Sequence, residues 1–174
     1  MRLTMKKMNR LPAMILIALL LFATAGASVA EDHPVKVVRL GTSGYTMEAY
    51  ESLTEEAFPE ESASNGMMSY LRDDEIGLIL EVYQYGKQDY PGTLADFVEQ
   101  DAKRYGGANV IPNGEINGLN AGWYEISDPE GDFRITYLFL EDEAQYLVIG
   151  YIAETDDAWD EMRLILDSLK RTDE

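Results

Sequence analysis

The chain has 174 residues, no cysteine and a formal charge of −18, from 14 Lys and Arg against 32 Asp and Glu. So acidic a surface repels nucleic acid and anionic lipid, which excludes a nucleic-acid-binding protein. The missing cysteine excludes disulfides, thiol catalysis and a lipoprotein anchor. Hydrophobic residues make up 46% of the chain and aromatic residues 10%, and 11 of the aromatic residues are tyrosines. This composition favours a folded domain over a disordered one.

The first thirty residues have the three-part layout of a secretory signal peptide. Four basic residues stand in the first ten positions, an apolar run follows over 11–22, and small residues lead to a cleavage site at Ala30. A retained membrane anchor is the alternative. In both cases the basic start holds the first residues in the cytoplasm, so we expect the rest to be exported. Cleavage would leave 144 residues with a formal charge of −22.

The first half of the mature chain predicts strands at 35–40, 45–50, 67–72 and 76–85. Residues 51–65 are rich in Glu, Ser and Pro without a clean period, which predicts an irregular loop with one helical turn at most. Within 76–85, Leu78 and Leu80 alternate with Ile79 and Tyr83, so both faces of that strand are apolar. This pattern indicates a central strand that is covered on both sides.

A helix is predicted at about 93–105. Thr93 is an N-cap residue with Asp96 three positions later, and Gly106-Gly107 supplies a left-handed stop. Strands at 119–126, 133–140 and 145–153 follow, joined by short turns that require an antiparallel meander. The last apolar stripe predicts a helix at about 157–170.

These elements predict an α+β fold, a three-layer α/β/α sandwich whose central antiparallel sheet has about six to seven strands. We expect a signal peptide over 1–30, a short mobile N-terminus over 31–34, a single domain over 35–170 and a C-terminal tail over 171–174.

Several stretches resemble the PsbP-like and DcrB-like family of small exported proteins. They are Val38–Met47, the strand Leu80–Tyr85 that leads to a helix starting at Thr93, Glu115–Tyr124 with its Asn-Gly-x-x-Ala pattern, and the closing Asp167-Ser168-Leu169. The resemblance covers nearly all of the mature chain and implies a three-layer α/β/α sandwich. It implies no reaction, since members of this fold mostly bind partners, and a fold does not fix a function.

Aromatic residues give the clearest indication of a binding site. Tyr83, Tyr85 and Tyr90 bracket the link from the central strand to the first helix, where exposed rings could stack on a ligand. Trp123 lies beside Glu125, a pairing that could hold a sugar ring next to a carboxylate. The structural alternatives are that the tyrosines cover the sheet under the helix and that Glu125 faces solvent.

Other chemistry has little support in the sequence. The only histidine is His33, just after the predicted cleavage site, so a histidine-based triad, a zinc site and a cofactor are not expected. Calcium is a weaker alternative, because three acidic clusters lack the EF-hand spacing and are typical of hairpin turns. These clusters are 73–75, the trio Asp128, Glu130 and Asp132, and 141–143.

The leading hypothesis is a non-enzymatic exported binding or assembly module. The alternatives are a carboxylate-dependent hydrolase of envelope glycans, with Glu125 as its best candidate, and a calcium-dependent interaction module. The partner would be a protein or a small molecule, with cationic partners favoured by the charge. Membrane contact is expected only through an uncleaved signal segment.

Overall fold

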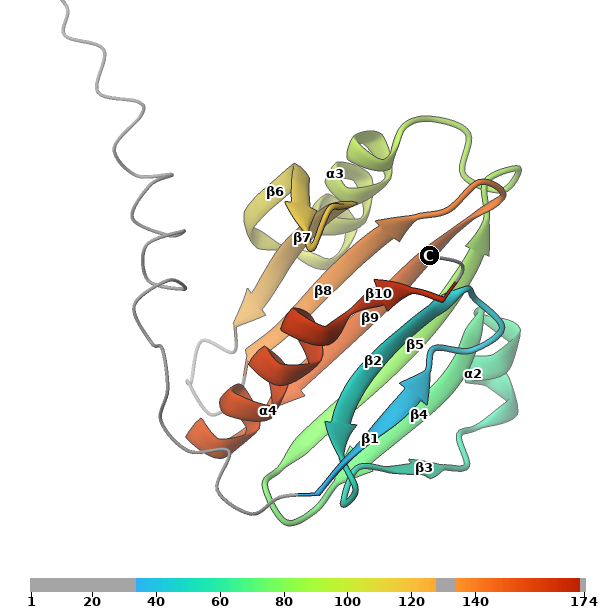
Figure 1. Ribbon diagram of the computed structural model, residues 1–174. Coiled ribbons are helices and arrows are strands. Elements are labelled where there is room, and N and C mark those ends of the chain that lie inside the picture. Colours follow the sequence, from blue (N-terminus) through green and yellow to red (C-terminus); the bar gives the residue numbers. More distant parts are fainter. Residues whose placement is uncertain (1–33, 128–133, 173–174) are drawn as a thin grey trace, which may run out of the picture. The chain divides into compact units, whose positions relative to one another are not determined.

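A seven-stranded antiparallel sheet sets the architecture (Figure 1). Its order is β3 (Thr54–Glu56), β4 (Met67–Asp73), β5 (Leu78–Gly86), β9 (Gln145–Ala153), β8 (Arg134–Glu141), β7 (Leu119–Ser127) and β6 (Ala108–Ile116). The computed structural model describes residues 34–127 and 134–172, which belong to the compact unit Pro34–Glu174. The predicted signal peptide with Ala30, His33 and the acidic trio Asp128, Glu130 and Asp132 lie outside the described residues.

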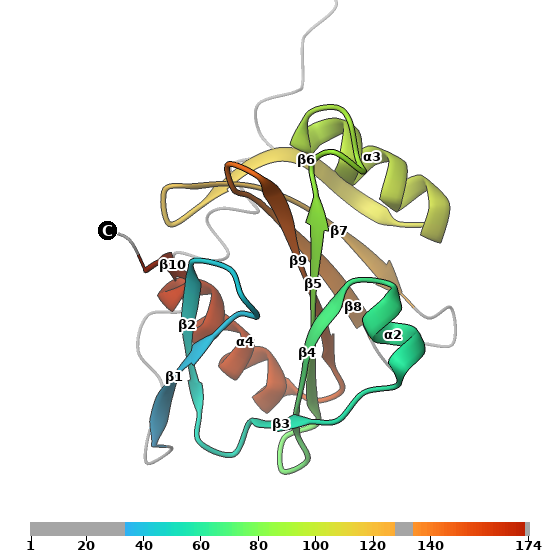
Figure 2. The same cartoon turned by 90° about the vertical axis from the view of Figure 1, so that its right-hand side faces the viewer.

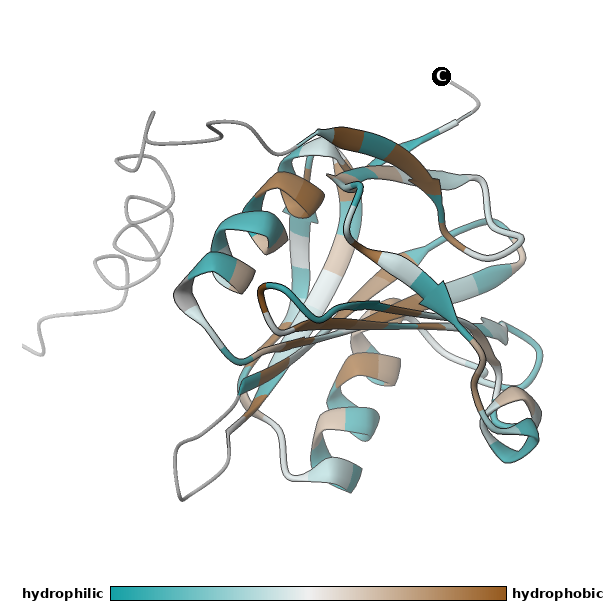
Figure 3. Cartoon of the chain, turned by 90° about the horizontal axis from the view of Figure 1, so that it is seen from below, coloured by the Kyte–Doolittle hydropathy of each residue, from teal (hydrophilic) through white to brown (hydrophobic). Residues whose placement is uncertain are grey.

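Layers of different composition cover the two faces of this sheet (Figures 2 and 3). On one side lie α4 (Asp156–Ser168) and a small sheet with the order β1 (Val35–Arg39), β2 (Tyr45–Tyr50) and β10 (Lys170–Arg171). On the other side lie α3 (Leu94–Tyr105) and the short α2 (Glu60–Ser64). The predicted α+β sandwich is confirmed, and the small sheet is an addition that the sequence did not indicate.

Each face of the large sheet has its own hydrophobic core. The larger core lies under α4 and the small sheet and includes Leu80, Ile149 and Ile165, all fully buried. The smaller core lies under α3 and includes Phe97, Phe139 and Tyr146. β5 is central, as predicted, but its two faces differ. Leu78, Leu80 and Val82 are fully buried, whereas the residues between them on the α3 side are only partly buried.

Helix α3 begins and ends as its sequence predicts. Thr93 Oγ1 accepts a hydrogen bond from the Asp96 N–H, and the Asp96 carboxylate accepts one from the Thr93 N–H, which completes a capping box. Gly106 at the C-cap has φ of 74°, a left-handed conformation that glycine adopts without a steric penalty.

Helix α4 completes the free edge of β2. β10 pairs with Tyr45 and Thr46 only, so no strand of the described residues lies beside the rest of that edge. There the Glu48 N–H donates to Ser168 Oγ and the Tyr50 N–H donates to Glu161 Oε1, both at 2.8 Å. Two side chains of α4 therefore do what a longer β10 would do, since a buried N–H needs an acceptor.

The C-terminus of α4 is held by Asn117, in the turn between β6 and β7. The Asn117 Nδ2 group donates to the carbonyls of Leu166, Asp167 and Leu169, at 2.6, 3.1 and 3.1 Å. The helix ends at Ser168, two residues before the predicted end, because these carbonyls are bonded to Asn117 and the chain turns into β10. Asn117 has φ of 51°, which asparagine tolerates better than most residues.

The edge strand β6 was not predicted. Its residues alternate between exposed and half-buried rather than buried, and Pro112 interrupts it, so its sequence lacks a strand pattern. Its pairing with β7 shifts register between Ala108 and Ile111 and again before Gly114. Irregular pairing and proline are typical of edge strands, where a missing N–H costs little. Within the described residues, no helix is long and apolar enough to cross a membrane.

Replacing Asn117 should destabilise the domain through α4. Asn117→Gly keeps the positive φ accessible and removes the three hydrogen bonds, so we expect the free energy of unfolding to fall by about 2 kcal/mol. Asn117→Ala should cost about 1 kcal/mol more, because alanine is strained at that φ. Chemical denaturation measures both, with the exposed Asn113→Ala as the matched control. Equal stability of Asn117→Gly and the wild type would contradict this assignment.

The carboxyl group of Glu161 should make stability depend on pH. The side chain is fully buried, and its Oε2 atom has no hydrogen-bond partner among the described residues. Burial, followed by repulsion from Asp73, raises the pKa of Glu161 to about 7, although the Tyr50 N–H and Lys36 oppose the shift. Between the ordinary glutamate pKa and about 7, the folded protein holds a proton that the unfolded chain releases.

Folding stability from this group is therefore complete at low pH and is lost as the pH rises through about 7. Proton binding that is tenfold tighter in the folded state than in the unfolded state contributes about 1.4 kcal/mol. Denaturation midpoints at about pH 5 and about pH 8 should separate the wild type from Glu161→Gln, which has no such proton to lose. The same pH dependence in both proteins would rule out Glu161 as its source.

Candidate functional site

The five residues predicted as a binding site lie on opposite faces of the large sheet. Tyr83, Tyr85 and Tyr90 are together on the α3 side. The rings of Tyr83 and Tyr85 are stacked at 6.2 Å with 5° between their planes, and Tyr90 meets Tyr85 edge-on at 5.2 Å. Tyr85 and Tyr90 also contact Phe97 of α3, so these two tyrosines largely cover the end of the smaller core.

Trp123 and Glu125 lie on the α4 side. Trp123 packs against the larger core, with its ring over Gly114, where an added Cβ would lie 2.5 Å from the ring. The Glu125 Oε2 atom accepts a hydrogen bond of 2.7 Å from the Asn109 amide. Glu125 therefore has an amide partner on β6, and the sheet separates it from the tyrosines.

The structure forms a row of residues across five strands on the α3 side, which we call the tyrosine row. In register order it consists of Tyr70, Glu81, Gly150, Tyr137 and Tyr124. Gly150 lies between Glu81 and Tyr137, and a Cβ there would be 3.0 Å from the Tyr137 ring and 3.5 Å from Glu81 Oε2. The missing side chain lets the Tyr137 ring lean over the backbone toward the Glu81 carboxylate.

Two more residues, Tyr83 and Asp101, are hydrogen-bonded to members of the row, and we count them with it. Tyr83 donates to Glu81 Oε2 at 3.0 Å. Tyr124 donates to Asp101 Oδ2 of α3 at 2.8 Å. Tyr137 lies between them, with its ring 5.3 Å from that of Tyr124. The row is thus a set of aromatic rings with a carboxylate near each end.

The electrostatics of the row follow from partial burial and two negative charges. Burial, followed by the charges of Glu81 and Asp101, raises the pKa of Tyr137 to about 12. Burial first, and then the charge of the neighbouring carboxylate and the hydrogen bond to it, raises the pKa of Tyr83 and of Tyr124 well above the ordinary tyrosine value. Burial also raises the pKa of Asp101, against the opposing effects of Tyr124 and Arg104. The tyrosines therefore remain neutral hydrogen-bond donors at physiological pH.

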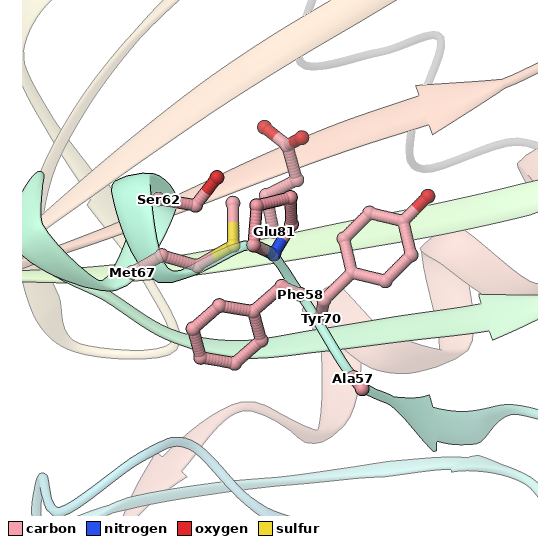
Figure 4. Close-up of a pocket in the computed structure, with 7 residues that line it drawn as sticks. Ala57, Phe58, Ser62, Met67, Tyr70 and Glu81 are labelled. Atoms are coloured by element: carbon pink, nitrogen blue, oxygen red, sulfur yellow. The ribbon is translucent and has the colours of Figure 1, made fainter.

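The part of the face that α3 does not cover is partly exposed. Glu81, Tyr83 and Tyr137 are half-buried there, and so is the adjoining row of Ile79, Ile152, Ile135 and Ile126. We call these residues the open face. Toward α2 it meets a hollow of about 310 Å³ lined by Phe58, Pro59, Ser62, Met67, Tyr70 and Glu81 (Figure 4). Glu81 lines the hollow and also belongs to the open face and to the tyrosine row, so it connects the hollow to the row.

Sequence reasoning missed Glu81, Asp101, Tyr124 and Tyr137. The alternation of residues along 76–85 did predict that Tyr83 and Tyr85 lie on one face of β5, and this was the only sequence signal for the site. It could not show that Glu81 faces Gly150 and Tyr137, because cross-strand register depends on partners almost 70 residues away.

The described acidic clusters already have partners within the protein. Asp73 accepts hydrogen bonds from Ser52 and from the Glu75 N–H. Asp142 pairs with Arg171 at 2.8 Å. Among the described residues, no group of three or more His, Asp or Glu side chains is placed to hold a metal ion.

Comparisons with known proteins identify the fold. No protein-family model matches the chain, and no curated protein matches it. A solved structure from Bacteroides thetaiotaomicron aligns with 76% of this chain at 11% identity and a TM-score of 0.49, and the match spans only 49% of that protein.

The solution structure of cyanobacterial PsbP from Synechocystis sp. PCC 6803 is similar over most of both proteins. The match covers 86% of this chain and 99% of that one, with 12% identity and a TM-score of 0.53. The fold is therefore PsbP-like, as the sequence motifs indicated.

Proposed function

We propose that this protein is a non-enzymatic binding or assembly module, exported from the cytoplasm, that docks a partner on the open face. One observation carries the proposal: three half-buried tyrosines, Tyr70, Tyr83 and Tyr137, gather with the Glu81 carboxylate on a partly exposed sheet face beside a hollow. Aromatic rings with a polar tip provide large contact areas at low entropic cost, which is why they are enriched in protein interfaces. The PsbP-like fold and the signal-like N-terminal sequence support the module and its export, respectively.

The hydrolase alternative has less support. A glycosidase needs two carboxyl groups about 5–10 Å apart across a pocket. Glu125, the predicted candidate, is bonded to the Asn109 amide instead. The wild type and Glu125→Gln should both give no turnover on envelope glycans, and a turnover lost in Glu125→Gln would overturn the non-enzymatic assignment.

The calcium alternative predicts a clear thermal effect, and our proposal predicts none. Saturating calcium that binds only the folded state would raise the unfolding temperature by several degrees. Because Asp73, Glu141 and Asp142 of the turn clusters are engaged with Ser52, Lys87 and Arg171, we expect the same unfolding temperature in calcium and in chelator. A rise in calcium that is reversed by chelator would favour the calcium-dependent module.

Site-specific photo-cross-linking tests docking on the open face. A photoreactive phenylalanine derivative is placed at Tyr137 or Ile79, and at Val37 as the control. Val37 is 66% exposed on β1, in the other layer. In cells that export the protein, the two open-face positions should give the same discrete adduct and Val37 should not. Equal labelling at all three positions, or an adduct from Val37 alone, would contradict the proposal.

A further inference from the structure

Two tyrosine–carboxylate pairs elsewhere in the domain already hold a cation of the chain itself. Arg171 pairs with Asp142 at 2.8 Å, and its guanidinium lies over the Tyr45 ring, 5.8 Å from the centroid. Lys87 similarly pairs with Glu141 at 2.8 Å and lies 5.5 Å from the centroid of Tyr146. A cation gains at such a site from the carboxylate charge and from the electron-rich ring face together.

The tyrosine row has the same components without the cation. Glu81 and Asp101 each accept a tyrosine hydroxyl, but within the described residues neither forms an ion pair with Lys or Arg. The charge of Arg104 reaches Asp101, yet its guanidinium lies over the ring of Tyr105, 5.3 Å from the centroid. Each carboxylate has oxygen lone pairs left after accepting one hydroxyl, and a carboxylate can accept about four hydrogen bonds.

We infer that the tyrosine row is a receptor for a basic side chain, arginine in preference to lysine, from an extended segment of the partner protein. The inference rests on the proposed function and names the chemistry of its partner. The cationic group would lie over Tyr137 between Glu81 and Asp101, and its apolar stem would lie along the isoleucines of the open face.

Arginine suits this row for geometric reasons. A planar guanidinium can stack on an aromatic ring while its edge donates two parallel hydrogen bonds to a carboxylate, and an ammonium group cannot. The isoleucine row begins with Ile79, two residues before Glu81 and on the same face of β5, so the methylene stem of the same side chain meets apolar surface. The net charge of −18 adds long-range attraction for any basic segment.

Binding of short probes tests the inference directly. The probes are end-blocked Gly-Ile-Arg-Ile-Gly, the same peptide with lysine or with uncharged citrulline in place of arginine, and a neutral chitin oligosaccharide. We expect the arginine peptide to bind most tightly and lysine less tightly, with both weakened by added salt. Citrulline binding as tight as arginine, or binding of the oligosaccharide alone, would overturn the inference.

Matched variants locate the binding. Glu81→Gln and Asp101→Asn each keep the side-chain shape and remove one charge of the row, so each should weaken arginine binding about tenfold. Glu99→Gln makes the same charge change on an exposed position of α3 and should stay within about twofold of the wild type. An equal loss in Glu99→Gln would show that net charge, and not the row, attracts the peptide.

A pH titration of the wild type keeps the test valid if a row variant fails to fold. Burial raises the pKa of Asp101, so arginine binding should weaken as the pH falls and this carboxylate becomes protonated, and a pH-independent affinity would contradict the inference. Photo-cross-linking separates the two proposals. Adducts at Tyr137 without any preference for arginine would leave the docking function standing and reject this ligand, whereas missing adducts would reject the function itself.

Discussion

Two N–H groups on β2 determine how the layers of this domain are arranged. The N–H groups of Glu48 and Tyr50 lie past the short stretch of β2 that pairs with β10. They donate hydrogen bonds to Ser168 and Glu161 of α4 instead. Because a helix supplies the acceptors, α4 must lie alongside the small sheet, and the two together cover one face of the large sheet. The cost is a buried carboxyl group, Glu161, whose pKa rises to about 7.

This arrangement leaves the opposite face with unequal cover. α3 packs over the β6, β7 and β8 end of the sheet, so residues of β5 and, on β9, Ile152 stay partly exposed on that side. Tyrosine suits such a surface, since its ring packs on neighbours while its hydroxyl reaches a polar group. Tyr83 and Tyr124 find their polar groups in Glu81 and Asp101, which places two negative charges in a row of aromatic rings. The candidate site therefore follows from how the layers cover the sheet.

Local sequence signals predicted the elements that depend on local interactions. Thr93 and Asp96 marked the start of α3, and alternation marked the strands of the meander. The elements that were missed depend on distant partners. β6 is an irregular edge strand without a buried face, and β10 exists because Lys170 and Arg171 pair with β2. The same distinction holds for the candidate site. Tyr83 and Tyr85 could be grouped from the sequence because they share a strand, but only the register of β5, β9 and β8 brings Glu81 to Tyr137.

Tyrosine-specific isotope labelling tests whether the tyrosine row binds a basic partner. The ring signals of the half-buried Tyr83 and Tyr137 should shift on addition of the arginine peptide. Those of Tyr45, which already carries Arg171 over its ring, and of the fully buried Tyr151 should stay unchanged. Unchanged signals of Tyr83 and Tyr137, or equal shifts in all four tyrosines, would contradict binding on the row.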